Sequence, residues 1–285
     1  MKGKTMKKLL YQVLGFEKNI QFTDYLLKVT DPEQYRPRKV PAVIVNLLTK
    51  FFQARKGYQL LSEGNSNSKQ AKLAKSFGFI VFNLSLAHFK TSGFNTCPFA
   101  TKACSDGCVA NNGNAQKYES IPKSRKLKTR FFKLNQAAFI TMLKSDIEKA
   151  RRRAKKLGLK LVIRLNAFSD VAWEHYLDLE SYDDIQLYDY TKWYSRLGNV
   201  PSNYHLTFSL SEKNLHHAKL ASARGFNVAV VFDTPEFPPQ WNNRPVVNGD
   251  THDYTFMHPR GHVIGLKAKG KTARNDKSGF VQITS

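Results

Sequence analysis

Cysteine is scarce in this chain, whose 285 residues include only three. An odd number of cysteines cannot all pair as disulfides, and these three fall together within residues 97–108. This pattern argues against a secreted disulfide scaffold, which needs pairs of cysteines spread through the chain. It favours a metal site in a reducing compartment, so we expect the protein in the cytoplasm.

Long apolar runs are also missing. No stretch of 18 apolar residues occurs, so we expect no transmembrane helix and no membrane partner. The basic N-terminal segment contains a short apolar stretch, but Glu17 and Lys18 interrupt it, so we predict no signal peptide there. Apolar residues still make up 41% of the chain, which is enough for a substantial core.

Acidic residues are few, with 22 Asp and Glu against 45 Lys and Arg, and the formal net charge is +23. Residues 1–160 contain 32 basic and 9 acidic residues, whereas residues 161–285 contain 13 of each. Such an uneven positive field indicates binding to nucleic acid, either DNA or RNA, although a solubilising surface is the alternative. The candidate contact residues are Arg125, Lys126, Lys128, Arg130, Arg151, Arg152 and Arg153.

The chain divides by pattern into two parts. Residues 1–70 read as a basic helical extension, with a helix that starts near Pro41 and a polar loop over 62–70. Residues 71–285 read as one domain. In it, Asn135 is placed to cap a long helix that Gly158 ends, and Ser211 is placed to cap a helix over 211–225.

Six short apolar runs in the second part predict β-strands. The pattern also predicts helices between several of these runs. Strands that alternate with helices are typical of a parallel sheet. We therefore expect an α/β fold, with a partial parallel barrel of about six strands preferred over a doubly wound sheet. The runs are 77–86, 159–166, 184–190, 203–210, 226–232 and 262–268.

The three cysteines, Cys97, Cys104 and Cys108, lie in the loop after the first of these strands. Soft thiolates select iron–sulfur clusters or zinc. A structural zinc ion needs a fourth ligand, for which His88 is the nearest candidate. A 4Fe-4S cluster accepts three cysteines and leaves one iron open to another ligand. The spacing matches neither the ferredoxin pattern nor a zinc finger, so an iron–sulfur cluster, a zinc ion and unliganded thiols all stay open, with the cluster preferred.

Polar residues follow the other predicted strands where those strands end. Because parallel strands end at the same edge of a sheet, these residues predict a ring around a cluster and a ligand. Ordinary turn and capping roles are the alternative for them. The ring consists of Asn166, Ser169, Asp170, Asp189, Lys192, Ser209, Glu212, Lys267 and Lys269.

Several segments together resemble the gene-88-type family of phage proteins, which is uncharacterised. They are the three-cysteine loop, "RLNAFSDVAWE", "LYDYTK", "NYHLTFSLSEKN", "VAVVF", "VNGDTHDYTF" and "VIGLKAKGKTARNDKSGFV". The resemblance covers roughly residues 78–285. It implies a phage origin and the host cytoplasm, and it brings no established activity.

The layout is more loosely similar to that of radical S-adenosylmethionine enzymes, which also place three cysteines after the first strand of a partial barrel. That similarity implies S-adenosylmethionine as a ligand of the open iron, although the cysteine spacing here differs. Three hypotheses follow: an iron–sulfur protein that binds nucleic acid, a cluster-dependent enzyme, and a zinc-stabilised structural module.

Overall fold

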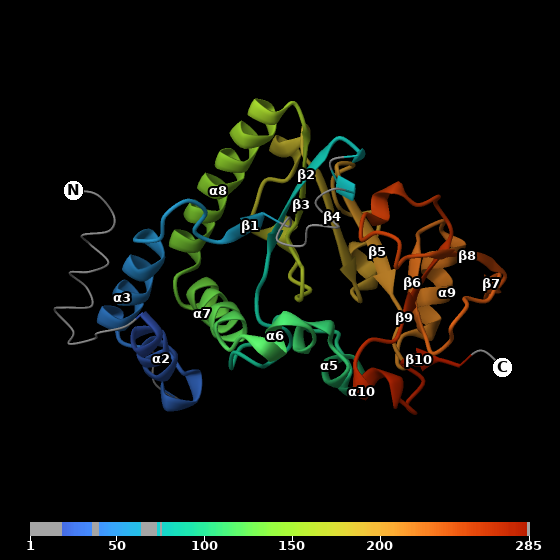
Figure 1. The fold of residues 1–285 in the computed structure, drawn as a ribbon, viewed down its shortest axis with the longest axis horizontal. Coiled ribbons are helices and arrows are strands. Elements are labelled where there is room, and N and C mark those ends of the chain that lie inside the picture. Colours follow the sequence, from blue (N-terminus) through green and yellow to red (C-terminus); the bar gives the residue numbers. More distant parts are fainter. Residues whose placement is uncertain (1–18, 36–39, 64–72, 75, 284–285) are drawn as a thin grey trace.

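The computed structural model describes residues 19–35, 40–63, 73–74 and 76–283 (Figure 1). In these residues the strands form one mixed ten-stranded sheet, so the predicted α/β class is confirmed. The strands are β1 (Leu61–Glu63), β2 (Phe79–Leu84), β3 (Lys160–Arg164), β4 (Gln186–Thr191), β5 (Tyr204–Ser209), β6 (Val228–Phe232), β7 (Gln240–Trp241), β8 (Arg244–Asn248), β9 (Val263–Lys267) and β10 (Val281–Gln282).

The order of strands in the sheet is β1-β2-β3-β4-β5-β6-β9-β8-β7, with β10 paired to β6. The strands β2, β3, β4, β5, β6 and β9, which the six apolar runs predict, pair side by side in parallel. The two ends of the path are antiparallel, since β1 pairs with β2 and β7 with β8 in that sense. Within the described chain the path is open, because no pairing joins β1 to β7.

The longest helices are α7 (Ser120–Leu134) and α8 (Gln136–Leu157), followed later by α9 (Leu215–Ala223). Helices α8 and α9 pack against the sheet, α8 on β3 and α9 on β5 and β6. The Asn135 side chain accepts a hydrogen bond from the backbone N–H of Ala138, and Gly158 ends α8 in the left-handed conformation, as predicted. The cap of α9 differs, because Asn214 precedes this helix and its side chain holds the Ser211 backbone N–H.

Shorter helices complete the chain. The α-helices are α2 (Asn19–Val29), α3 (Ala42–Gln53), α5 (Lys102–Asp106), α6 (Asn114–Lys117) and α10 (Lys271–Arg274). The 3-10 helices are η1 (Pro32–Tyr35), η3 (Val109–Asn111), η4 (Trp173–His175), η5 (Glu180–Tyr182), η6 (Tyr194–Arg196) and η7 (Thr255–Met257).

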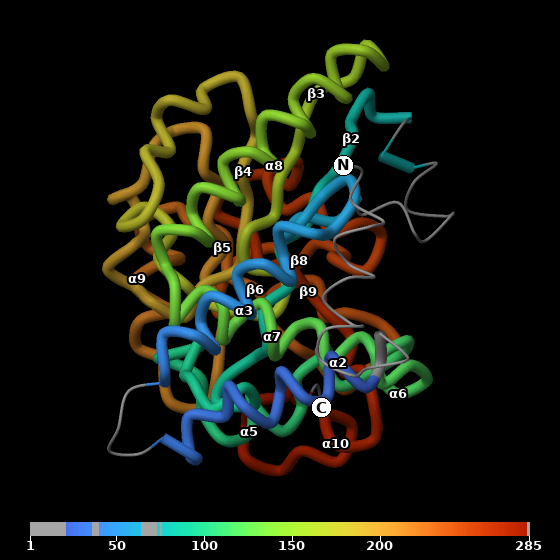
Figure 2. Tube along the Cα trace, turned by 90° about the vertical axis from the view of Figure 1, so that its left-hand side faces the viewer, coloured from blue at the N-terminus to red at the C-terminus, as the bar shows by residue number. Residues whose placement is uncertain are grey.

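The N-terminal helices share the main core. Phe22 of α2 and Phe52 of α3 belong to the same buried cluster as Phe82 of β2. The Phe52 and Phe131 rings stack with their centroids 4.9 Å apart, and Figure 2 shows α2 and α3 beside α7. The described part of the predicted extension is therefore helical and packed, and it also contributes β1. Residues 1–18, 36–39 and 64–70 of that extension lie outside the described residues, and the boundary at residue 70 stays a prediction.

A buried carboxylate joins α8 to the segment before β1. Asp146 is 0% exposed, and its Oδ2 accepts hydrogen bonds from the backbone N–H groups of Gln59, Leu60 and Leu61 at 2.7, 2.7 and 3.1 Å. Lys128 of α7 donates to the Leu60 carbonyl at 2.6 Å, and burial lowers the pKa of Lys128 to about 7. Both helices therefore hold the same short segment.

The lowered pKa of Lys128 predicts a pH dependence of stability. An unfolded lysine has its ordinary pKa of 10.5, so between pH 7 and 10.5 the unfolded chain binds more protons than the folded one. The free energy of unfolding should therefore rise with pH through this window. That of the Lys128→Met variant should rise less over the same window. Urea unfolding of both proteins at pH 7 and pH 9.5 checks this. Equal pH slopes would show that folded Lys128 keeps its charge.

Candidate functional site

A cavity of about 1180 Å³ lies where the strands end and the cysteine loop begins. Each of the six predicted strands, β2, β3, β4, β5, β6 and β9, contributes lining residues, and helix α7 contributes others. All three cysteines line this cavity. Seven of the nine residues in the predicted ring line it with them: Asn166, Ser169, Asp170, Lys192, Ser209, Lys267 and Lys269. Segments far apart in sequence therefore meet at one site.

The cysteine loop is held by hydrogen bonds at each end. The Phe89 backbone N–H donates to Cys97 Sγ at 3.3 Å. Cys104 lies in α5, whose N-cap residue Thr101 accepts from the Cys104 backbone N–H at 3.2 Å. Cys108 directly precedes η3. The three thiols are free and half-buried. Burial raises the pKa of Cys97, and it raises that of Cys108 to about 11.

Glu212 does not line the cavity, yet it contacts the cysteine loop. Its carboxylate accepts a hydrogen bond from the Thr101 hydroxyl at 2.9 Å, and Thr101 caps the helix that contains Cys104. The residue belongs to the turn after β5, so it ties that strand end to the loop. Glu212 was expected in the ring, but we assign it the role of positioning the cysteine loop.

Two cations flank the thiols. Arg125 of α7 lies with its guanidinium carbon 3.9 Å from the Phe168 ring centroid and donates to the Ala110 carbonyl at 2.8 Å. Lys192 donates to Ser209 Oγ at 2.6 Å, and its positive charge acts to lower the pKa of Cys108 against the effect of burial. Both charges would stabilise anionic sulfur in the cavity.

Asp189 lies on the opposite face of the sheet from the cavity. Successive side chains of a strand point to opposite faces, so Tyr188 and Tyr190 line the cavity and Asp189 turns away. It is 0% exposed and accepts hydrogen bonds from the Asn166 backbone N–H at 2.8 Å and the Tyr204 hydroxyl at 2.6 Å. Burial raises its pKa to about 6. The expected place of Asp189 in the ring is therefore corrected.

Two other members of the ring are engaged within the protein. Asn166 Oδ1 accepts hydrogen bonds from Ser169 Oγ and Trp173 Nε1 at 2.8 and 3.1 Å. Asp170 accepts from the Lys192 backbone N–H at 2.8 Å and from Arg196 Nη1 at 3.0 Å. These side chains shape the wall of the cavity, which agrees with the alternative structural role for them.

The predicted nucleic-acid residues are scattered. Arg125 and Lys128 line the cavity. Arg130 is 5% exposed and donates to the backbone carbonyls of Ser92 and Leu27, so it serves the fold and does not lie on a surface.

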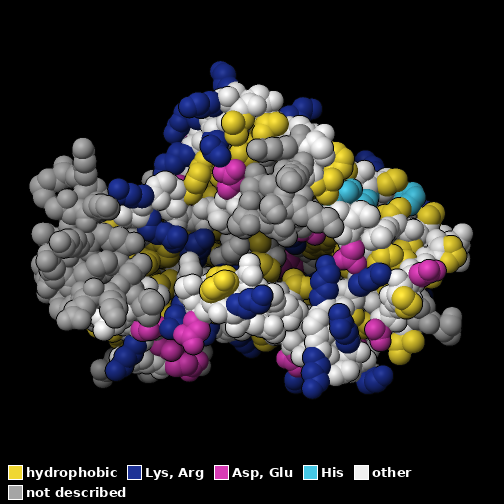
Figure 3. All heavy atoms as spheres, in the orientation of Figure 1, with side chains coloured by type: hydrophobic (Ala, Val, Ile, Leu, Met, Phe, Trp, Pro, Cys, Tyr) yellow, Lys and Arg dark blue, Asp and Glu magenta, His cyan; other side chains and the backbone are white. Residues whose placement is uncertain are grey.

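The remaining four lie on or near helix surfaces. Arg151 pairs with Glu148 and Asp184, and Arg153 pairs with Glu63. Lys126 and Arg152 form no ion pair with any residue the structure describes. Figure 3 shows basic side chains along the flank formed by α8.

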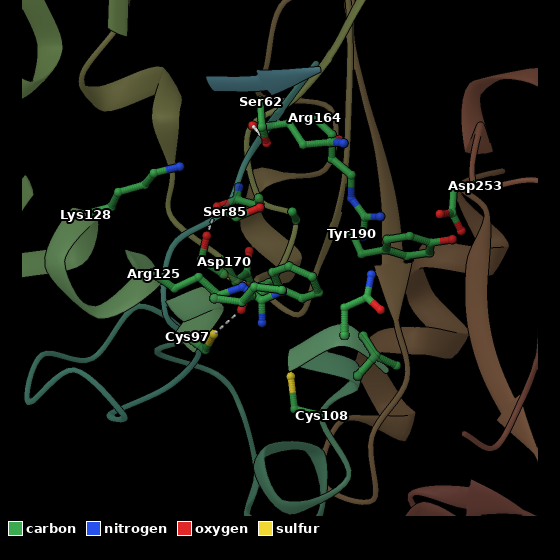
Figure 4. A pocket seen from close by; sticks show the side chains of 18 of the residues that line it. Ser62, Ser85, Cys97, Cys108, Arg125, Lys128, Arg164, Asp170, Tyr190 and Asp253 are labelled. Atoms are coloured by element: carbon green, nitrogen blue, oxygen red, sulfur yellow. Dashed lines mark hydrogen bonds between the residues drawn. The ribbon is translucent and has the colours of Figure 1, made fainter. Parts of the chain in front are cut away.

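The cavity is also lined by residues that the sequence analysis did not predict, among them Asn83, Ser85, Arg164, Tyr188 and Tyr190. In Figure 4, Arg164 extends from β3 toward the Tyr190 ring, with Cys97 and Cys108 at the other end of the cavity. The available signal was alternation: Arg164 interrupts an otherwise apolar strand, and Tyr188 and Tyr190 are two residues apart in β4.

Two features are absent from the residues that the structure describes. No group of three histidine, cysteine or acidic side chains lies close enough to hold one metal ion. His88 is 7% exposed and does not line the cavity with the cysteines. Across the same residues, none of the helices has both the length and the apolar composition that crossing a bilayer demands.

The fold and the site define an α/β protein with a three-cysteine cavity at the ends of its strands. The sequence matches the model of the Gene product 88 family over residues 55–283, and the chain belongs to this family, as the resemblance implied. The match also takes in residues 55–77, which the resemblance had left out. No curated protein and no solved structure matches the chain.

Proposed function

We propose that this phage-family protein binds a 4Fe-4S cluster through Cys97, Cys104 and Cys108. The observation that carries the proposal is that all three cysteines line one large cavity together with the strand ends. Thiolates are the ligands that iron–sulfur clusters take. We propose the host cytoplasm as its compartment, because reduced thiols and iron–sulfur clusters both suit a reducing environment.

The arrangement of donors favours a cluster over zinc. Four ligands of one zinc ion lie within about 2.3 Å of it and must therefore crowd together. The described residues contain no such group of three, and His88 lies outside the cavity. The thiolates of a cluster each bind a different iron, so they stand farther apart. The charges of Arg125 and Lys192 would offset part of the negative charge of the thiolates.

Three cysteines leave one iron without a protein thiolate, and we propose that this position faces the cavity. A bound cluster would supply an open iron for a small molecule, and S-adenosylmethionine is the ligand that the looser resemblance implies. This chain's residues would then orient that molecule. The six predicted strands, β2 to β6 and β9, would act as a partial barrel around it, with their carboxyl ends toward the cluster.

Metal analysis of protein purified without oxygen tests the proposal. We expect about four iron atoms and about four acid-labile sulfides per chain, with broad visible absorption that bleaches on reduction. One zinc ion per chain without sulfide would contradict the cluster and support the zinc-stabilised module. S-adenosylmethionine added to the reduced protein should alter the electron paramagnetic resonance spectrum if it reaches the open iron.

We also propose nucleic-acid affinity, which the formal net charge of +23 favours. The candidates without an ion pair among the described residues are Arg152, which is exposed, and Lys126, which is half-buried. Arg130 is buried, and Arg151 and Arg153 are paired with acidic residues. Binding to a labelled single-stranded DNA or RNA should weaken steeply between about 50 and 200 mM salt. Fluorescence anisotropy measures this, and no binding at the lower salt concentration would contradict the proposal.

A further inference from the structure

The end of the cavity away from the cysteines gathers five polar side chains from three adjacent elements. Asn83 belongs to β2 and Ser85 follows it, Arg164 ends β3, and Tyr188 and Tyr190 belong to β4. Asn83 and Arg164 are directly paired in the parallel register of β2 and β3. All five line the cavity, and Figure 4 labels three of them: Ser85, Arg164 and Tyr190. We call these five residues the oxyanion cluster.

Arg164 is the charged member of the oxyanion cluster. Its Nε is buried and, among the described residues, no atom accepts a hydrogen bond from its guanidinium. The nearest ion-pair contact joins Nε to Asp189 Oδ1 at 4.0 Å, which is too long for a hydrogen bond. Asp189 already accepts hydrogen bonds from Asn166 and Tyr204. Buried guanidinium groups normally donate, so this one is arranged for a partner from outside the chain.

The side chains around Arg164 fix its position without satisfying it. The guanidinium carbon lies 5.1 Å from the Tyr190 ring centroid and 5.9 Å from that of Tyr188. The side-chain polar groups of Asn83, Ser85, Tyr188 and Tyr190 also form no hydrogen bond within the described chain. Asp253 lies near enough to act on Arg164 electrostatically, and it lines the same cavity.

The other end of the cavity is different. Asn166, Asp170, Lys192 and Ser209 line it too, and each is hydrogen-bonded within the protein. Among the described residues that line the cavity, Arg164 Nε is the buried side-chain donor without an acceptor. A planar guanidinium presents parallel N–H groups that match the two oxygens of a carboxylate or a phosphate. Hydroxyl and amide donors beside it add directed hydrogen bonds.

We infer that the oxyanion cluster binds the carboxylate or phosphate group of a small molecule that occupies this cavity. At about 1180 Å³ the cavity exceeds what one oxyanion needs, so the rest of the ligand would extend toward the cysteines. The inference does not depend on the proposed iron–sulfur cluster, because none of the five residues is a cysteine.

Isothermal titration of the purified full chain with three probes tests the inference. Adenosine 5′-monophosphate carries a phosphate, malonate carries carboxylates, and adenosine carries neither. We expect at least one of the two anions to bind and adenosine not to bind, and the anion that binds identifies the oxyanion. Arg164→Gln should weaken that binding about tenfold or more. Lys144→Gln is the control, because it removes one exposed charge on α8. It should change the affinity for the anion less than about twofold.

A second variant protects the test against misfolding. Tyr190→Phe removes one hydroxyl and keeps the ring, so it should fold like the wild type and weaken anion binding several-fold. Equal weakening by Arg164→Gln and Lys144→Gln would overturn the inference, as would no binding of either anion. Anion binding by protein that contains no iron would uphold the inference. The missing iron would then contradict only the proposed cluster.

Discussion

Cys108→Ser is expected to lose most of the bound iron and sulfide of the anaerobically purified protein, at least about tenfold. A serine hydroxyl stays protonated where a thiol can ionise onto a metal, so it is a poor replacement ligand. Cys97→Ser and Cys104→Ser should behave in the same way, because each thiolate would hold a different iron. Iron and sulfide assays with visible spectra measure the loss.

Ser105→Ala is the matched control. Ser105 follows Cys104 in the short helix α5 and precedes Cys108 in the chain. It should retain the full iron content. Circular dichroism shows whether each variant is folded. Full iron in all three cysteine variants would exclude the proposed ligand set. Loss in only one or two of them would show that another residue binds the metal.

Asp146→Ala should destabilise the protein by about 3–5 kcal/mol. The substitution leaves the backbone N–H groups of Gln59, Leu60 and Leu61 without their acceptor, and it leaves Lys149 without the carboxylate 3.1 Å from its Nζ. Buried donors without acceptors are costly because they have also lost their hydrogen bonds to water. Urea unfolding followed by circular dichroism measures the free energy of unfolding.

Asp184→Ala provides the comparison. Asp184 pairs with Arg151 at 2.7 Å, but both side chains are substantially exposed, so its loss should cost under about 1 kcal/mol. Asp146→Asn should fall between the two, because the amide keeps one acceptor oxygen and loses the charge. A loss below about 1 kcal/mol for Asp146→Ala would show that water replaces the carboxylate.

The strands of the fold could be predicted because burial leaves a continuous apolar run. The same continuity obscures the direction of each side chain, since apolar residues occupy both faces of these strands and only a few polar residues, such as Arg164, mark the cavity side. Asp189 was therefore expected at the cavity and lies on the opposite face, whereas Tyr188 and Tyr190 were overlooked. The antiparallel strand β1 is only three residues long and carries too little pattern to recognise.

The candidate site was predictable where its residues cluster in sequence. The three cysteines lie within one loop, so their common location follows from the chain itself. Contacts such as Thr101 with Glu212 join residues 111 positions apart, and no local pattern contains them. Arg164 was missed for a related reason: its inferred role rests on a buried donor with no acceptor among the described residues, which only the packed fold reveals.

The two short antiparallel strands also act as end pieces of the sheet. A strand at a sheet edge presents unpaired N–H and C=O groups to any other chain, and short edge strands limit this hazard. β1 covers β2 at one end, and at the other β7 covers β8 with only two residues. A fragment that begins at residue 71 would remove β1 and open the whole edge of β2. Such a fragment would expose this edge to strand-to-strand aggregation, so β1 protects the sheet as well as extending it.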